Sequence, residues 1–188
     1  MMERTPPATL PSESRWEAAP RTRPTLVSIL AVLHIVSGAG ILFILVRYSS
    51  QLATLGGPIG ASPLFLNLSI LFLGALGLAS GIGMWRGAEW GWWLAGLYYV
   101  YGIYRNANAV FLISTMANEL AGEARGPGYY YFKHTARIFT HSLVLFYLFR
   151  DRVLAYFGLQ QLEKSRALVR LAAPIAVLIV IQLLALLS

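Results

Sequence analysis

The chain contains no cysteine, which excludes disulfide bonds, thiol catalysis and cysteine-ligated metals. Acidic residues are also scarce: eight Asp and Glu stand against fifteen Lys and Arg in 188 residues, and none lies inside a long apolar run. No paired carboxylates, serine–histidine–acid set or phosphate-binding loop is found. Proton-coupled transport usually needs acidic residues within the membrane, so this class is disfavoured as well. We predict that the protein is not an enzyme.

Long apolar runs make up most of the sequence. Hydrophobic residues make up 57% of the sequence and charged residues 12%. Five runs have about the length that crosses a hydrocarbon core of about 30 Å. We predict an all-α fold, a polytopic membrane helix bundle with five transmembrane helices and an interfacial amphipathic helix. The spans are expected at about 24–46, 63–85, 90–113, 129–149 and 171–188, and the interfacial helix at about 153–170.

The polar segments outside the apolar runs indicate the domain organisation. Residues 1–23 are polar and rich in proline, so we predict a disordered N-terminal tail. Residues 24–188 are predicted to form a single transmembrane helical domain. Residues 49–62 are expected to be a loop, because they carry no charge and contain a Gly-Gly-Pro sequence.

The basic residues indicate the orientation of the chain in the membrane. A net charge of +7 is compatible with nucleic-acid binding, but these residues flank the apolar runs, as the positive-inside rule expects. With the N-terminus inside, the inner segments carry ten Lys or Arg residues and the outer segments four. We therefore predict an N-in/C-out membrane protein with no nucleic-acid partner.

Small and aromatic residues suggest contacts within the membrane and at its surface. In the second run, one helical face carries Asn67, Gly74, Gly77 and Gly81, which favours close packing of another helix. Four tryptophans follow around the next turn and are predicted to anchor the helices at the interface. They are Trp85, Trp90, Trp92 and Trp93.

Arg105 is the most unusual residue, because it lies about 22 Å along the third predicted span. Tyr98, Tyr101, Arg105 and Asn108 share one face of this helix. No Asp or Glu lies within a predicted span to pair with the arginine. One interpretation is a site for an anion, a lipid phosphate or a propionate, helped by basic residues at similar depth, Lys133 and Arg137. The other is an arginine whose side chain extends to the outer headgroups.

Two histidines form a second candidate site. His34 and His141 lie about 15 Å and 12 Å from the inner ends of their predicted spans. Histidines on facing helices are able to ligate haem iron, and either one chlorophyll magnesium, with Gly38 and Gly74 leaving room. Alternatively, each histidine is hydrogen-bonded within the bundle, for example to Ser37, Ser142 or Asn67. No other metal site is predicted, since no carboxylate accompanies the histidines.

Two segments carry a resemblance to known proteins. One predicted span ends in a Gly-x-Gly-x-Trp-Arg-x-x-x-Trp-Gly turn within Gly81–Leu94. A later span ends in a basic turn followed by Val-x-x-Tyr-Phe within Arg150–Gly158. Both resemble segments of small uncharacterised multi-pass bacterial inner-membrane proteins. The resemblance implies a bacterial membrane origin and no particular activity.

Three functional hypotheses follow. The first is a non-enzymatic accessory or structural subunit that packs against partner membrane proteins or a second copy of itself, through the glycine face of the second span. The second is a membrane protein that binds a tetrapyrrole, haem or chlorophyll, through His34 and His141. The third is a membrane protein that binds a lipid or small anion at Arg105. In all three the lipid bilayer is a partner.

Overall fold

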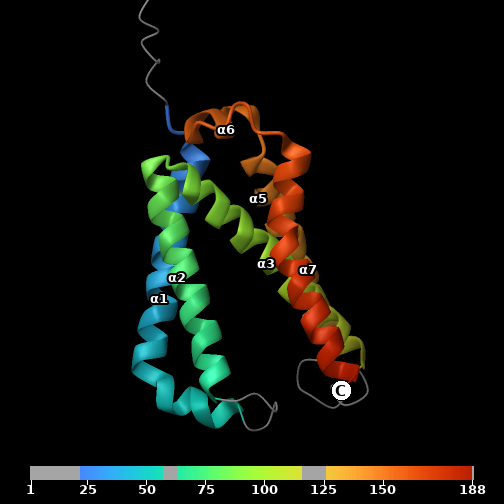
Figure 1. The fold of residues 1–188 in the computed structure, drawn as a ribbon. Helices are drawn as coiled ribbons and strands as arrows, with labels where there is room; N and C mark the ends of the chain where they lie inside the picture. The colour runs from blue at the N-terminus through green and yellow to red at the C-terminus, as the bar shows by residue number, and fades with distance from the viewer. Residues whose placement is uncertain (1–21, 57–62, 116–125, 188) are drawn as a thin grey trace, which may run out of the picture.

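The computed structural model describes residues 22–56, 63–115 and 126–187, and these residues are helical with short connections (Figure 1). The predicted all-α class is therefore confirmed. The predicted tail at residues 1–23 lies outside the described residues except for its last two. The helices are α1 (Thr25–Gly56), α2 (Pro63–Arg86), α3 (Glu89–Thr115), α5 (Pro127–Leu148), α6 (Asp151–Phe157) and α7 (Lys164–Leu187).

Five long helices run between the two ends of the molecule, and the short helix α6 lies across one end (Figure 1). Helix α1 packs along α2, whereas α3 contacts α2, α5 and α7. The beginning of α1 and the end of α7 lie at opposite ends. The α1–α2 pair and α7 lie on opposite sides of the view in Figure 1, and α3 crosses between them. Helix α3 thus joins the two halves of the bundle.

Glycines set the contact between α1 and α2. A Cβ atom on Gly81 would lie 2.7 Å from the backbone nitrogen of Ile35, and one on Gly38 would lie 2.8 Å from the carbonyl oxygen of Gly74. These distances leave no room for a side chain, so the two backbones meet directly. The predicted glycine face of α2 therefore packs against α1 of the same chain.

The buried core lies mainly at the α6 end. It contains residues from every described helix, with Trp92, Met84, Leu148 and Leu154 fully enclosed. Trp92 was predicted to be an interface anchor, but its side chain has no exposed surface. Trp92 faces the core because Gly96, on the same side of α3, lets this helix approach α7 closely. A Cβ atom on Gly96 would lie 2.8 Å from the side chain of Leu171 in α7.

The two segments that carry the resemblance lie against each other at this end. The hydroxyl of Tyr156 in α6 donates to the carbonyl oxygens of Met84 at 3.2 Å and Trp85 at 3.1 Å, in the last turn of α2. Gly87 then turns the chain with φ +66°, and its Cβ position would lie 2.9 Å from the Tyr156 ring. Arg23 also donates to the Trp85 carbonyl. These donors satisfy helix-end carbonyls that lack a partner within the helix.

Several helix bounds differ from the prediction. Helix α1 continues through the expected loop to Gly56, with a kink at Tyr48, because residues 49–55 contain no glycine or proline. The expected interfacial helix 153–170 is two elements: α6 ends at Phe157 and is capped by Gly158, whose φ of 76° is left-handed, and Lys164 begins α7. Pro174 lies inside α7 and not in its first turn.

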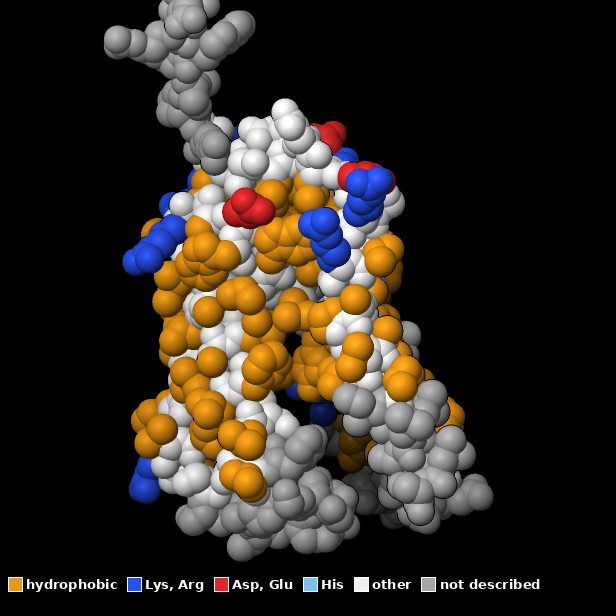
Figure 2. Space-filling model, viewed as in Figure 1, with side chains coloured by type: hydrophobic (Ala, Val, Ile, Leu, Met, Phe, Trp, Pro, Cys, Tyr) orange, Lys and Arg blue, Asp and Glu red, His pale blue; other side chains and the backbone are white. Residues whose placement is uncertain are grey.

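Two of the described helices are apolar and long enough to cross a membrane, Thr25–Ser49 and Asn67–Arg86. Large apolar side chains are nevertheless exposed on other helices too, including Phe132 of α5 (75%) and Val169 of α7 (68%). Figure 2 shows that apolar side chains cover the middle of one face, while the acidic side chains on that face lie at the α6 end. A broad exposed apolar surface of this kind is typical of contact with lipid or with another protein.

Candidate functional site

The two predicted histidines lie against the same pair of tyrosines. His34 of α1 is 4% exposed, and its ring centroid lies 4.8 Å from that of Tyr98 and 5.2 Å from that of Tyr99. The ring of His141, on α5, lies 5.6 Å from Tyr99 and 6.5 Å from Tyr98. Histidines 107 positions apart are thus brought to one side-chain cluster between α1, α3 and α5, which we call the histidine–tyrosine cluster.

Both imidazoles are held in the same way. Nδ1 of His34 lies 2.9 Å from the carbonyl oxygen of Leu30, and Nδ1 of His141 lies 2.6 Å from that of Arg137. A carbonyl oxygen only accepts hydrogen bonds, so each Nδ1 is assigned the proton and each Nε2 is left as an acceptor. Nε2 of His34 is buried without a hydrogen-bond partner. The alternative that each histidine is hydrogen-bonded within the bundle is thus observed, with main-chain carbonyls as the partners of the imidazoles in place of Ser37, Ser142 or Asn67.

The space around the histidines is filled by protein. A Cβ atom on Gly102 would lie 2.7 Å from Nε2 of His141, so this ring lies directly on the backbone of α3. Gly38 and Gly74, which were expected to make room for a macrocycle, instead pack α1 against α2. The imidazole acceptors suit axial ligation, but a tetrapyrrole would have to displace the rings of Tyr98 and Tyr99.

A buried asparagine next to this cluster was missed by the sequence analysis. Asn106 is 1% exposed; its Nδ2 donates to the carbonyl oxygen of Gly102 at 2.7 Å, and its Oδ1 accepts from Nδ1 of His134 at 2.9 Å. Asn108, which the sequence singled out, is exposed. The available signal was the seven-residue spacing of Trp92, Tyr99, Asn106 and Ile113, all of which are buried.

The polar stripe predicted on α3 is divided between two places. Tyr98 belongs to the histidine–tyrosine cluster, whereas Tyr101 and Arg105 line a cavity of about 360 Å³ between α1, α2 and α3. The side chain of Arg105 is exposed and makes no ion pair with the described residues. The remaining lining is mostly aliphatic. It consists of Ile41, Ile44, Ser69, Ile70 and Leu73.

The three predicted basic residues lie near one another. Arg105 of α3 and Lys133 and Arg137 of α5 are close enough to His134 for their charges to act on it. Figure 2 shows Lys or Arg atoms deep in a hollow between α2 and α7. The described acidic residues, Glu89, Asp151 and Glu163, lie near the α6 end of the bundle, away from this cluster, while Glu119 and Glu123 fall outside the described residues. This part of the molecule therefore concentrates positive charge beside an apolar cavity.

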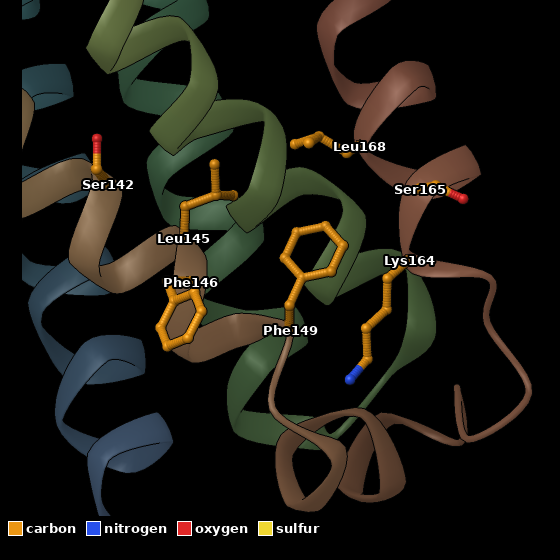
Figure 3. Close-up of a pocket in the computed structure, with 7 residues that line it drawn as sticks. All are labelled: Ser142, Leu145, Phe146, Phe149, Lys164, Ser165 and Leu168. Carbon is orange, nitrogen blue, oxygen red and sulfur yellow. The ribbon is translucent and has the colours of Figure 1, made fainter.

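A second apolar cavity lies between α5 and α7 near α6 (Figure 3). It measures about 400 Å³, and Leu145, Phe146, Phe149 and Leu168 form its walls. Lys164 stands at one end and Ser142 at the other. An adjoining cavity of about 450 Å³ shares Phe146, Phe149 and Lys164 with it, and adds the polar residues Arg150, Asp151 and Arg152.

No protein-family model, curated protein or solved structure matches this chain. The resemblance to small bacterial inner-membrane proteins over Gly81–Leu94 and Arg150–Gly158 stays a prediction. In the structure the two segments contact each other, since the ring of Tyr156 in one lies against Gly87 in the other.

Proposed function

We propose that the protein spans a bacterial inner membrane with five helices, N-in/C-out, and binds an anionic amphiphile without transforming it. The amphiphile is a lipid or fatty acid that carries a phosphate or carboxylate. Its binding site is the cavity between α1, α2 and α3, and Arg105 supplies the charge. The observation that carries this proposal is an arginine without a described ion-pair partner in the lining of an otherwise mostly aliphatic cavity.

The lengths and directions of the helices support the membrane arrangement. Helices α1, α2, α3, α5 and α7 contain 32, 24, 27, 22 and 24 residues. At 1.5 Å per residue each is longer than a hydrocarbon core of about 30 Å. The first helix begins and the last ends at opposite ends of the bundle, as an odd number of spans requires.

Three hydroxyl side chains within the helices are hydrogen-bonded as they are in an apolar medium. Ser37 donates to the carbonyl oxygen of His34, Ser80 to that of Gly77, and Thr140 to that of Ala136. Such bonds within one helix remove the need for water. Arg105 has no such bond among the described residues, and its exposed guanidinium group is therefore available to a ligand.

The lining of the cavity matches the two parts of an anionic amphiphile. The side chains of Ile41, Ile44 and Leu73 suit an acyl chain, because they offer it the same apolar contacts as neighbouring lipid tails. The guanidinium group of Arg105 is planar and offers paired donors to two oxygens of a phosphate or carboxylate.

Native mass spectrometry of the protein in mild detergent tests this proposal. Arg105→Gln is expected to lose a bound anionic lipid or fatty acid that the wild type retains. Arg47→Gln is the matched control, because Arg47 is also exposed near the end of α1 opposite α6 but does not line the cavity. Equal retention of every anionic species in the wild type and Arg105→Gln would contradict the proposal.

A second pair of variants tests the apolar part of the cavity. Ile44→Trp fills it and is expected to reduce retention of the same species. Val46→Trp serves as its control, because Val46 is 82% exposed and lies outside the cavity lining. A phosphate-bearing species and a carboxylate-bearing species are distinguished by their masses.

Tetrapyrrole binding is a separate candidate, supported by the buried, unpartnered Nε2 atom of His34. Expression with haem supplied should then yield a Soret band that both His34→Ala and His141→Ala remove. Absence of the band in the wild type rejects this candidate. The accessory-subunit hypothesis has lost its main support, because the glycine face on which it depended packs within the chain.

A further inference from the structure

The cavity between α5 and α7 has an apolar part and a charged end. Leu145, Phe146, Phe149 and Leu168 point into the same space from the two helices (Figure 3). Helices α5 and α7 do not pack closely here, so these side chains leave an open groove. The exposed fraction of Phe146 is 72% and that of Leu168 is 48%, which leaves them available to an acyl chain.

The end of the groove nearest α6 is basic. Arg150, Arg152 and Lys164 surround it, together with the single carboxylate of Asp151. Lys164 forms an ion pair with Asp151 at 2.6 Å. Arg150 and Arg152 are exposed and make no ion pair within the described part of the chain. Three cations against one carboxylate leave two unbalanced positive charges at this end.

The groove and its basic end are aligned along the bundle. The beginnings of α1 and α7 and the turn between α2 and α3 lie at the same end of the molecule as α6. If the long helices cross the membrane, this end is level with the headgroups of one leaflet. A charged end at headgroup depth, continuous with an apolar groove that runs toward the bilayer centre, matches a membrane phospholipid.

We propose that this groove binds an anionic glycerophospholipid of the leaflet on the α6 side. One acyl chain lies between Leu145, Phe146 and Leu168, and the phosphate is held by Arg150, Arg152 and Lys164. The proposal rests on the membrane arrangement proposed above, but not on the Arg105 cavity. The Arg105 cavity lies between α1, α2 and α3 and the groove between α5 and α7, so the two sites share no helix and face different leaflets.

Asp151 sets the strength of this site. Its carboxylate holds Lys164 and lies among the cations that would receive the phosphate. Removing its charge by Asp151→Asn frees the lysine ammonium and removes a repulsive charge. The retention of an anionic lipid should therefore increase in this variant, opposite to the effect of removing a cation.

The test uses the full chain reconstituted in vesicles of equimolar phosphatidylglycerol and phosphatidylcholine. After mild detergent extraction, native mass spectrometry measures the ratio of the two lipids retained. The wild type should retain phosphatidylglycerol preferentially. Arg152→Gln should reduce that preference about fivefold, because one basic residue at a membrane surface contributes about 1 kcal/mol. Arg170→Gln is the control, since Arg170 is an exposed residue of α7 outside the groove.

The apolar part of the groove has its own pair of variants. Leu168→Trp fills the groove and should reduce retention of phosphatidylglycerol, while Val169→Trp, at an exposed neighbouring position outside the lining, should not. Equal retention of the two lipids in the wild type overturns the inference, and so does an unchanged ratio in Arg152→Gln. A co-purifying polypeptide that excludes lipid from the groove would also overturn it.

These experiments test the Arg105 cavity and the groove separately. Loss of a lipid in Arg105→Gln, with the ratio unaffected by Arg152→Gln, would retain the proposed function and reject the groove. The reverse result would retain the groove and reject the Arg105 cavity.

Discussion

The indole Nε1 of Trp92 donates to the main-chain carbonyl oxygen of Leu148 at 2.9 Å, and neither side chain has any exposed surface. This bond joins α3 to the last turn of α5 across 56 positions of the sequence. The Leu148 carbonyl lies where a helix has no partner of its own, so Trp92 satisfies a group that would otherwise be buried unpaired.

Trp92→Phe removes this donor and part of the core volume. We expect it to lower the free energy of unfolding by about 2–4 kcal/mol, from the unpaired carbonyl and the space left behind. Denaturant or thermal unfolding in detergent measures the loss. Trp90→Phe is the control, because Trp90 is 44% exposed. If both variants unfold alike, Trp92 does not hold α3 to α5.

Alanine at the glycines of the α1–α2 contact should separate these helices. A Cβ on Gly81 would meet the carbonyl oxygen of Ala31 at 2.8 Å, and backbone atoms cannot move aside as side chains do. We expect Gly81→Ala to destabilise the protein by about 1–3 kcal/mol. Gly40→Ala, in the same pair of helices, has no atom within 4 Å of its new methyl group and should be neutral or slightly stabilising. Thermal unfolding of the two variants compares them directly, and equal effects would contradict this packing.

The neighbouring asparagines of α3 provide a third test. Asn106→Ala leaves His134 without its 2.9 Å partner and opens a small cavity, so we expect a loss of about 1–3 kcal/mol. Asn108→Ala changes an exposed residue and should alter stability by no more than about 0.5 kcal/mol. Equilibrium unfolding of both variants measures the difference. A larger loss in Asn108→Ala than in Asn106→Ala would contradict the stabilising role assigned to Asn106.

The sequence predicted the bounds of the helices more successfully than it predicted which face of each helix is buried. Helix α2 was expected at 63–85 and covers Pro63–Arg86, because proline begins it and a glycine turn follows it. The division between α6 and α7 was hidden, since residues 153–170 keep an amphipathic composition through the loop. The left-handed Gly158 ends α6, and residues 158–163 separate it from α7.

For the candidate site residues too, the sequence predicted the position along each helix but not the side of the helix that faces inward. Depth along the spans placed His34 and His141 at similar levels, and the structure brings both to Tyr98 and Tyr99. Depth does not show which side of α3 faces inward, and that side is set by contacts of small residues such as Gly102. Trp92 was therefore assigned to the membrane surface although it lies in the core. For the same reason Asn106, one of the three buried polar or charged residues in the described part of the chain, was overlooked.

Tyr156 offers a test that depends on pH. Burial raises the pKa of its phenol above the ordinary value of 10.0, although the nearby charge of Arg23 acts in the opposite direction. A group whose pKa is higher in the folded state stabilises the fold below its unfolded pKa, and this contribution is lost as the pH rises. The two carbonyl bonds of Tyr156 should make the wild type more stable than Tyr156→Phe by about 1 kcal/mol near neutral pH.

The stability difference between the wild type and Tyr156→Phe should then shrink as the pH rises from about 8 to about 11. Thermal unfolding of both proteins across this range measures it, and subtracting the two curves cancels the titration of the other tyrosines and lysines. A Tyr156→Phe difference that does not change with pH would mean that the phenol ionises in the folded protein as it does in the unfolded chain. Its hydroxyl would then not be held between α6 and the end of α2.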